Sequence, residues 1–204
     1  IKKRGGHEFV FYKHDPGDPR SLEHDNISDI VQDFNGDYWI STMGGGIARL
    51  SKEHLPEPVF EHYNTSNSGL LSDNIYDLAL DSVRNSLWIC SSNYINSLDF
   101  STDEINQLQY YTRSNETVGN MSHIFIDSRS RLWIGGNGFC IIDLKNTKEG
   151  YECIYFRHKL DEPESKINEK INCIIETKSK DIYLGSQGNG IYLLDKNERY
   201  GEYK

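Results

Sequence analysis

The chain has 204 residues, with 22 Lys and Arg against 31 Asp and Glu, and a formal net charge of −9 that gives a pI of about 5.2. This acidic balance argues against nucleic acid as a partner, because binding to phosphates needs clustered Lys and Arg. The length allows a sizeable core, and no apolar run reaches the roughly 18 residues that a membrane-spanning helix needs. Because the sequence begins with Ile1 and not with Met, we expect it to be a piece of a longer protein, whose membrane anchor would lie outside it.

Four segments of the sequence repeat one pattern: an aromatic residue between aliphatic ones, small residues, a Gly or Asn turn and a second apolar run. The first segment reads DYWISTMGGGIARL from Asp37, and the others read SLWICSSNYINSL, RLWIGGNGFCIIDL and DIYLGSQGNGIYLL. An acid precedes each aromatic. Both series recur every 45 to 50 residues, a period typical of propellers and helical repeats. These repeat anchors are Trp39, Trp88, Trp133 and Tyr183, with Asp33, Asp81, Asp127 and Glu176.

Each repeat contains short apolar segments separated by Gly, Asn, Ser and Asp, which indicates strands and not helices. We predict four strands in a repeat. Strand A ends at the acid, strand B carries the aromatic, strand C follows the Gly or Asn turn, and strand D is a second aromatic run. Strand A is expected at 26–33, 74–81, 121–127 and 171–176, and strand D at 59–63, 108–112 and 154–157, with a D-like run at 8–12.

The predicted fold is therefore a single all-β domain over 1–204, made of four four-stranded antiparallel propeller blades. The repeats run approximately over 8–57, 58–106, 107–150 and 151–204. In each repeat the acid should accept hydrogen bonds from the backbone N–H groups of the turn that follows, which Glu176 would do less well than Asp. The chain is either part of a larger propeller, which we favour, or a four-bladed ring that 8–12 closes by pairing with strand C of the fourth repeat.

The four cysteines, Cys90, Cys140, Cys153 and Cys173, lie in apolar, strand-like runs, and none forms a CxxC pair that would support zinc binding. We interpret them as buried free thiols. The alternative is a disulfide between Cys140 and Cys153, which flank the turn near 146–150 almost symmetrically. An oxidising compartment would allow that bond.

The sequence contains no motif for catalysis or metal binding. There is no HExxH, no Gly-x-Ser-x-Gly and no EF-hand spacing. The glycines at 44–46 do not form a phosphate loop, because no GK[ST] motif or strand–loop–helix unit surrounds them. We therefore expect no catalytic residue, no metal and no cofactor.

The segment from His62 to Ser92, HYNTSNSGLLSDNIYDLALDSVRNSLWICSS, resembles the two-component regulator propeller repeat. The first repeat resembles it as SLEHDNISDIVQDFNGDYWISTMGGGI and the third as MSHIFIDSRSRLWIGGNGF. The fourth, INCIIETKSKDIYLGSQGNGI, is the weakest match, with Tyr183 in place of Trp. Four units of this kind cover nearly the whole chain.

This resemblance implies the periplasmic part of a hybrid two-component sensor. In such proteins seven-bladed propellers precede a membrane helix, a cytoplasmic histidine kinase and a receiver domain that carry a phosphorelay. The resemblance also implies oligosaccharide ligands and control of polysaccharide-utilisation genes. The four repeats would then be part of a seven-bladed propeller.

The expected blades place their D–A and B–C loops on one face of the propeller. The D–A loops are longer and more varied than the A–B turns, and variable loops on a rigid scaffold usually hold binding sites. Sugar recognition there would use aromatic faces and planar polar groups. The candidate ligand-binding residues are His14, Arg20, His24, Asn93, Tyr94, Arg113, Asn137, Phe139 and His158.

We therefore expect a periplasmic glycan-sensing region that performs no catalysis itself, in a histidine kinase that reaches the membrane through its own helix. Its expected partners are an oligosaccharide and either a second copy, in a homodimer, or the remaining blades of the parent. Ligand binding would shift the ectodomain between two states. Two alternatives stay open: a carbohydrate-active lyase or glycosidase, and a purely structural propeller that binds protein or dimerises.

Overall fold

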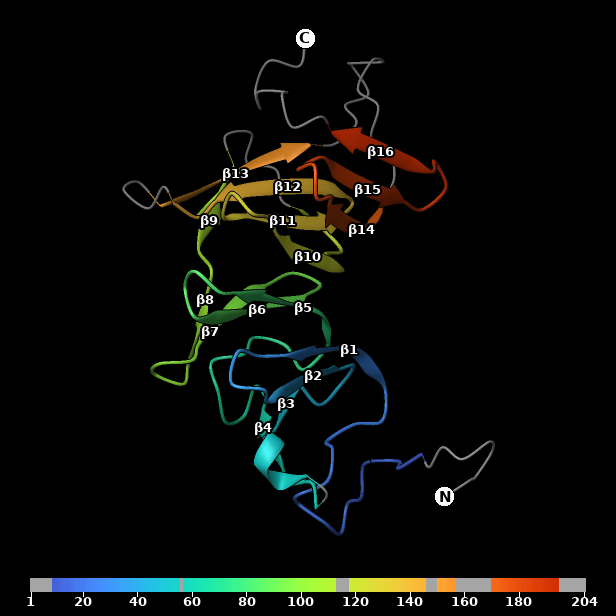
Figure 1. Cartoon of the computed structure of the whole chain (residues 1–204), viewed down its shortest axis with the longest axis vertical. Coiled ribbons are helices and arrows are strands. Elements are labelled where there is room, and N and C mark those ends of the chain that lie inside the picture. The colour runs from blue at the N-terminus through green and yellow to red at the C-terminus, as the bar shows by residue number, and fades with distance from the viewer. Residues whose placement is uncertain (1–8, 56, 113–117, 146–149, 157–169, 195–204) are drawn as a thin grey trace.

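The computed structural model describes residues 9–55, 57–112, 118–145, 150–156 and 170–194. Within these ranges the chain forms sixteen strands and one short 3-10 helix, η1 (Lys52–His54). The strands make four separate sheets, which Figure 1 shows following one another in a row, with the first and fourth at opposite ends. No helix in the described part of the chain is long and apolar enough to cross a bilayer.

The first two sheets are antiparallel meanders in which each strand pairs with the next one along the chain. The first sheet consists of β1 (Ile27–Gln32), β2 (Tyr38–Thr42), β3 (Ile47–Leu50) and β4 (Phe60–Tyr63). The second consists of β5 (Ile75–Asp81), β6 (Ser86–Ser91), β7 (Ile95–Asp99) and β8 (Glu104–Gln107). Each sheet is one blade, with the predicted order A to D, and β1 and β5 contact each other at the junction of the two blades.

The other two sheets keep this order but differ at their edges. The third blade contains β10 (His123–Ile126), β11 (Arg131–Gly136), β12 (Gly138–Asp143) and β13 (Tyr151–Phe156). A fifth strand, β9 (Tyr110–Tyr111), pairs in parallel with β13. The fourth blade has three described strands: β14 (Ile171–Glu176), β15 (Ile182–Ser186) and β16 (Ile191–Leu194). The A strands β5, β10 and β14 contact one another in succession.

The predicted all-β fold of four blades is confirmed, but the predicted D strand at 108–112 is wrong. The D strand of the second blade is β8, which pairs with β7, and Tyr110–Tyr111 belongs to the next blade. The error has a physical cause: β8 reads EINQ and is mostly exposed. An outer strand solvated on its faces carries no apolar signature.

The run 8–12 does not close a ring in the described structure. Residues 9–12 form no strand, and Glu8 lies outside the described residues. Tyr12 packs edge-on against Phe60 of the first blade, with ring centroids 5.9 Å apart. Among the described residues, no strand pairing joins the first and fourth blades. The repeat boundaries themselves stay a prediction.

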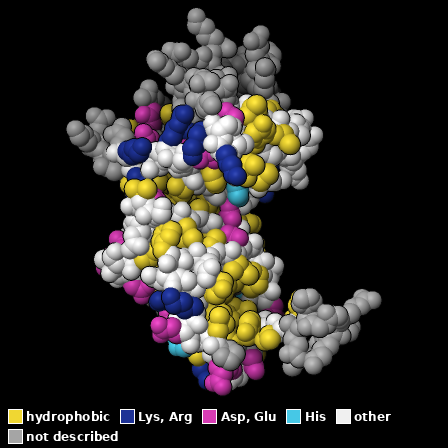
Figure 2. All heavy atoms as spheres, in the orientation of Figure 1, with side chains coloured by type: hydrophobic (Ala, Val, Ile, Leu, Met, Phe, Trp, Pro, Cys, Tyr) yellow, Lys and Arg dark blue, Asp and Glu magenta, His cyan; other side chains and the backbone are white. Residues whose placement is uncertain are grey.

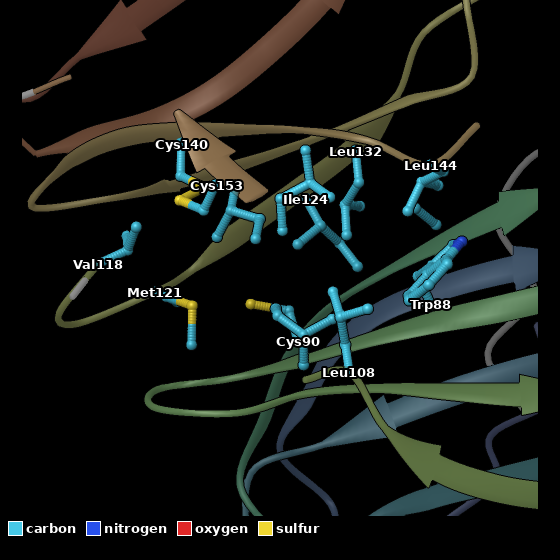
Figure 3. Packing of buried hydrophobic residues seen from close by; sticks show 14 residues of the cluster. Trp88, Cys90, Leu108, Val118, Met121, Ile124, Leu132, Cys140, Leu144 and Cys153 are labelled. Carbon is cyan, nitrogen blue, oxygen red and sulfur yellow. A yellow bond between two sulfur atoms is a disulfide. The ribbon is translucent and has the colours of Figure 1, made fainter. Parts of the chain in front are cut away.

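The core lies between the blades, where the tryptophan of each blade packs on the A and B strands of the next one. Trp39 contacts the cluster of Leu78, Leu87 and Ile89. Trp88 lies in the cluster that contains Leu132 of the third blade (Figure 3). In turn, Trp133 joins the buried isoleucines of β14 and the apolar side chains of β15. A buried aromatic of this size contributes a large share of the packing energy. The aromatic residue therefore recurs once for each junction between blades.

The acid at the end of strand A anchors both the following turn and the tryptophan. Asp33 Oδ1 accepts from the N–H groups of Asn35 at 2.8 Å and Asp37 at 3.0 Å. Asp33 Oδ2 accepts from the indole N–H of Trp39 at 2.9 Å. The same indole contact is made by Asp81 with Trp88 at 3.2 Å and by Asp127 with Trp133 at 2.9 Å. One carboxylate thus fixes the turn and orients the side chain that packs on the next blade.

In the fourth blade this anchoring position belongs to Thr177 and not to Glu176. Thr177 Oγ1 accepts from the N–H of Asp181 at 3.1 Å, and the Thr177 N–H donates to the Asp181 carbonyl at 2.9 Å. Glu176 is the last ladder residue, opposite Ile182. Its carboxylate accepts instead from the N–H and hydroxyl of Ser128, at 3.1 and 2.7 Å, in the third blade. The sequence alignment on acids is therefore one residue out of register in this repeat.

The cysteines divide into a disulfide and two free thiols. Cys140 on β12 and Cys153 on β13 are bonded, with their Cα atoms 5.8 Å apart. Cys90 is buried, as predicted, and burial raises the pKa of its thiol. Cys173 is exposed. The interpretation of all four as buried free thiols is thus correct for Cys90 alone, and the disulfide alternative is the one that the structure contains.

Candidate ligand-binding surface

The expected loop face carries a cavity of about 170 Å³ at the junction of the second, third and fourth blades. Its walls come from the D–A segments and the B–C loops, where binding was expected. The lining residues are Tyr76, Ser92, Asn120, Met121, Asn137 and Lys170. Ligand pockets typically measure about 300–1,000 Å³, so this cavity is smaller than most of them.

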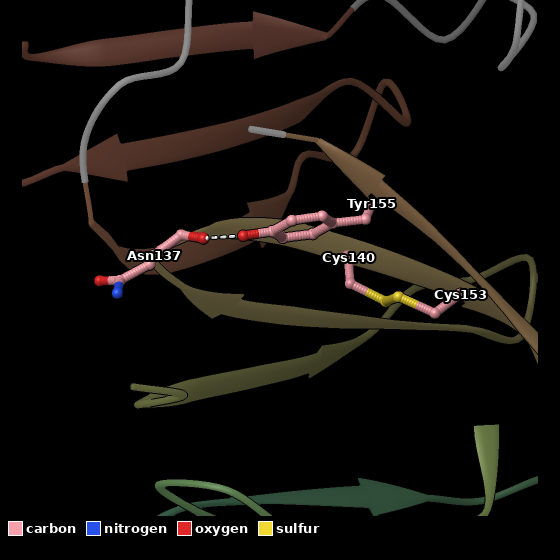
Figure 4. The surroundings of a disulfide bond; sticks show 4 residues. All are labelled: Asn137, Cys140, Cys153 and Tyr155. Atoms are coloured by element: carbon pink, nitrogen blue, oxygen red, sulfur yellow. Dashed lines mark hydrogen bonds between the residues drawn. A yellow bond between two sulfur atoms is a disulfide. The ribbon is translucent and has the colours of Figure 1, made fainter. Parts of the chain in front are cut away.

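Backbone hydrogen bonds hold the cavity walls in place. The Asn137 N–H donates to the Gly119 carbonyl at 3.0 Å, and the Met121 N–H donates to the Ser92 carbonyl at 3.0 Å. The Tyr155 hydroxyl donates to the Asn137 carbonyl at 2.6 Å, and Figure 4 shows the Asn137 carboxamide pointing away from this contact. The side chains of the lining therefore project from a fixed frame, which reduces the ordering cost of binding.

The lining offers a hydroxyl, a phenol, two amides and one ammonium group. Hydroxyls, amides and the Lys170 ammonium complement the hydroxyl groups of a sugar, since each supplies hydrogen-bond donors and most also accept. Among the residues that the structure describes, no group of three or more His, Cys, Asp or Glu side chains is placed to hold a metal ion. The lining can therefore offer hydrogen bonds to a polar ligand.

Among the candidates that the structure describes, Asn137 alone lines the cavity. Asn93 and Tyr94 are exposed in the β6–β7 loop, and their contact with a ligand stays a prediction. Arg113 and His158 lie outside the described residues. Phe139 does not fit the expected role, because it is only 4% exposed and stacks on Phe156 with centroids 4.6 Å apart.

The three candidates of the N-terminal loop are engaged within that loop beside the first blade. His14 Nδ1 lies 2.6 Å from the Leu22 carbonyl, Arg20 pairs with Asp18 at 3.1 Å, and His24 Nδ1 accepts from the Asn26 N–H at 3.0 Å. None of the three lines the cavity, so their role in binding also stays a prediction.

Sequence reasoning missed Lys170 and Tyr76 because nothing in the one-dimensional pattern separates them from ordinary strand ends. It also missed a row of polar side chains four residues before each turn anchor. These are Asp29, Asp77 and His123, from the first, second and third blades. A regular spacing of titratable residues on strand A was the signal that could have revealed them.

This row connects each blade to the next. Asp29 Oδ2 accepts from the Leu78 N–H at 3.2 Å, and Asp77 Oδ2 accepts from the Ile124 N–H at 2.8 Å. His123 Nδ1 lies 2.6 Å from Asp77 Oδ2, and its Nε2 lies 3.4 Å from the Ile174 carbonyl of the fourth blade. Two lining residues of the cavity, Tyr76 and Met121, lie within two residues of this row in the sequence.

The first of these strands lies within a segment that matches a known family. Residues 21–44 match the model of the two component regulator propeller. The chain carries this propeller repeat. The resemblance to this repeat, inferred from the sequence, is thereby confirmed. The matched segment includes the turn anchor Asp33 and Trp39.

Solved structures of larger propeller proteins resemble the whole array. The extracellular domain of the hybrid two-component system BT4673 from B. thetaiotaomicron is 19% identical, with a TM-score of 0.66 over 83% of this chain and 24% of that one. The corresponding domain of BT3049 from the same organism is 19% identical, with a TM-score of 0.51 over 90% and 28%. PorZ, a surface component of the type-IX secretion system of Porphyromonas gingivalis, is 16% identical, with a TM-score of 0.62 over 95% and 28%.

These likenesses establish the fold and the scale of the relatives. The chain spans about a quarter of the length of each of these three solved structures. No curated protein matches the sequence. The four blades therefore correspond to one portion of a larger propeller chain in each of these structures.

Proposed function

We propose that the chain belongs to the ligand-sensing ectodomain of a hybrid two-component sensor, and that it binds an oligosaccharide at the cavity between the second, third and fourth blades. The propeller repeat at 21–44 carries this proposal. The likeness to extracellular domains of two hybrid two-component systems supports it. In this role the propeller performs no catalysis, and the parent supplies the kinase and the phosphorelay that control polysaccharide-utilisation genes.

A periplasmic location is part of the proposal. The buried disulfide between Cys140 and Cys153 supports it, because such bonds persist in oxidising compartments and are rare in the cytosol. A membrane helix of the parent would link the ectodomain to the kinase. Ligand binding would then change the kinase by favouring one of two ectodomain states.

Calorimetric titration of the chain with neutral and acidic oligosaccharides tests the ligand. Replacing Lys170 with Met is expected to weaken binding of the active sugar at least about tenfold, because a hydrogen bond from a charged group is lost. Lys178→Met is the matched control, since Lys178 is exposed beyond the other end of β14 and should leave the affinity unchanged. Equal affinity of the Lys170→Met variant and the unmodified chain would remove the cavity as the site.

The outer face of the fourth blade supports a further proposal, that an additional propeller blade covers it. On this face Ile175, Tyr183 and Leu193 are ladder neighbours, as are Cys173, Gly185 and Ile191. Ile175, Ile191 and Leu193 are 56%, 72% and 57% exposed, and Figure 2 shows hydrophobic side chains gathered on this blade. Tyr183 occupies the position from which each tryptophan packs on the next blade, and the similar BT4673 domain is a longer chain, of which this one covers 24%.

In the chain by itself this face is expected to drive self-association, because exposed apolar surface favours pairing. Sedimentation of the chain should show a dimer that the double change Ile191→Asp and Leu193→Asp converts to a monomer. Val83→Asp is the control, since Val83 is 75% exposed on a turn of the second blade. A chain that sediments as a monomer at every concentration would argue against this face as an interface.

A further inference from the structure

His123 has a hydrogen-bond acceptor at each of its two ring nitrogens. The Asp77 carboxylate lies 2.6 Å from Nδ1, and the Ile174 carbonyl lies 3.4 Å from Nε2. A neutral imidazole has one N–H group, whereas the imidazolium has two. The ring can therefore donate to the second and fourth blades at the same time only when it carries both protons.

The groups around His123 favour this charged form. Burial alone would lower the pKa of His123, but the hydrogen bond and the charge of Asp77 outweigh it, so the pKa lies above its ordinary value. Asp29 on β1 adds negative charge from further away. The neighbouring strand β14 contributes the Ile174 carbonyl. On β11, Gly135 pairs with His123, and the buried thiol on β6 is Cys90.

Asp29 and Asp77 are the two carboxylates of this row. Burial and the charge of Asp77 raise the pKa of Asp29, because two adjacent carboxylates are costly to ionise together. Each carboxylate nevertheless accepts an N–H from the next blade. The row thus has a carboxylate at the first two blade junctions and a histidine where the third blade meets the fourth.

We propose that His123 is a proton-dependent tie that holds the third blade to both of its neighbours. With both protons, the ring donates to Asp77 and to the Ile174 carbonyl. When Nε2 releases its proton to water, the Nδ1–H bond to Asp77 stays and the contact with the fourth blade is lost. Because Met121 and Lys170 flank this junction, the tie also controls how firmly two walls of the cavity are held. This inference does not depend on which ligand binds there.

The direction of the pH dependence follows from the raised pKa of His123. A group whose pKa is higher in the folded state stabilises the fold fully below its unfolded pKa, about 6.5, and this contribution disappears as the pH rises through the folded value. The raised pKa of Asp29 acts in the same direction at lower pH. The junction of the third and fourth blades is therefore expected to weaken as the pH rises above neutrality.

Hydrogen exchange and NMR titration of the 204-residue chain test this tie. After correction for intrinsic rates, protection of the β14 amides is expected to fall about tenfold between pH 6 and pH 8, which corresponds to loss of one hydrogen bond from a charged donor. In the His123→Gln variant protection should be equal at both values. His54→Gln, a change at an exposed histidine, should keep the pH dependence of the unmodified chain.

The titration provides a measurement that does not require the variant at position 123 to fold. The His123 ring resonances of the unmodified chain should give a pKa above 6.5, and Asp77→Asn should lower it. A His123 pKa at or below 6.5 would overturn the proposal. So would the same loss of β14 protection in His123→Gln as in the unmodified chain.

Discussion

Replacing Asp127 with Ala is expected to lower the free energy of unfolding by about 4 kcal/mol at neutral pH. The Asp127 carboxylate is fully buried and accepts from the indole N–H of Trp133 and from the N–H groups of Arg129 and Arg131, at 2.9 to 3.0 Å. It also binds the guanidinium of Arg131, which lies over the Trp133 ring at 5.1 Å. The change would thus remove the acceptor of three N–H groups and the charge that balances Arg131.

Urea denaturation followed by tryptophan fluorescence would measure this loss. Asp143→Ala is the matched control in the same blade, because Asp143 is exposed and its carboxylate accepts from the turn N–H of Lys145. The control should lose less than about 1 kcal/mol. If Asp127→Ala were as stable as Asp143→Ala, the carboxylate would not be the anchor of the third blade.

Removing the disulfide, with the double change Cys140→Ser and Cys153→Ser, is expected to cost about 3 kcal/mol of unfolding free energy. The bond joins two residues 13 positions apart, and it restricts the unfolded chain over that loop. Both cysteines are also buried in the cluster between the second and third blades (Figures 3 and 4). Thermal unfolding with and without a reducing agent would measure the effect.

The reducing agent should destabilise the unmodified chain and leave the double variant unchanged. Cys173→Ser is the control, because this thiol is free and exposed. The Cys173→Ser variant should lose stability in reducing conditions as the unmodified chain does. Equal stability of the oxidised and reduced chain would contradict a structural role for the bond.

The blades could be predicted from the sequence because each one repeats the same local solution. An acid, a turn and a tryptophan recur in one order, and their hydrogen bonds are made within a single hairpin. Prediction from this pattern failed where a strand or side chain bonds outside its own hairpin. β8 is polar because it is an outer edge. The apolar run at 108–112 was assigned to the second blade, but β9 within it pairs with β13 of the third blade. The alignment placed the turn anchor of the fourth blade at Glu176, one position too early. The Glu176 carboxylate binds Ser128, 48 residues away, instead of its own turn.

The candidate site was predictable only as a face of the fold. The D–A and B–C loops indicated where ligands would bind, and Asn137 lies there. The other lining residues depend on how three blades meet, which no local pattern encodes. Phe139 illustrates the limit: one residue after the turn glycine, the chain directs it to Trp133 and Phe156 and not to the surface. The polar row across the blades likewise becomes visible only when the A strands are placed side by side.

Within each blade, strands β1–β8 and β10–β16 pair with their neighbours in the sequence, so a blade can fold as soon as its own strands have been synthesised. A hairpin closes in about 1–10 μs, whereas synthesis adds about 5–20 residues per second. The first sheet, complete at Tyr63, can therefore form before the hairpin of β5 and β6 has left the ribosome. Its face around Trp39 then stays in water until that hairpin arrives to cover it. Each finished blade is in this way the template for the next, and the array is expected to assemble from its first blade toward its fourth.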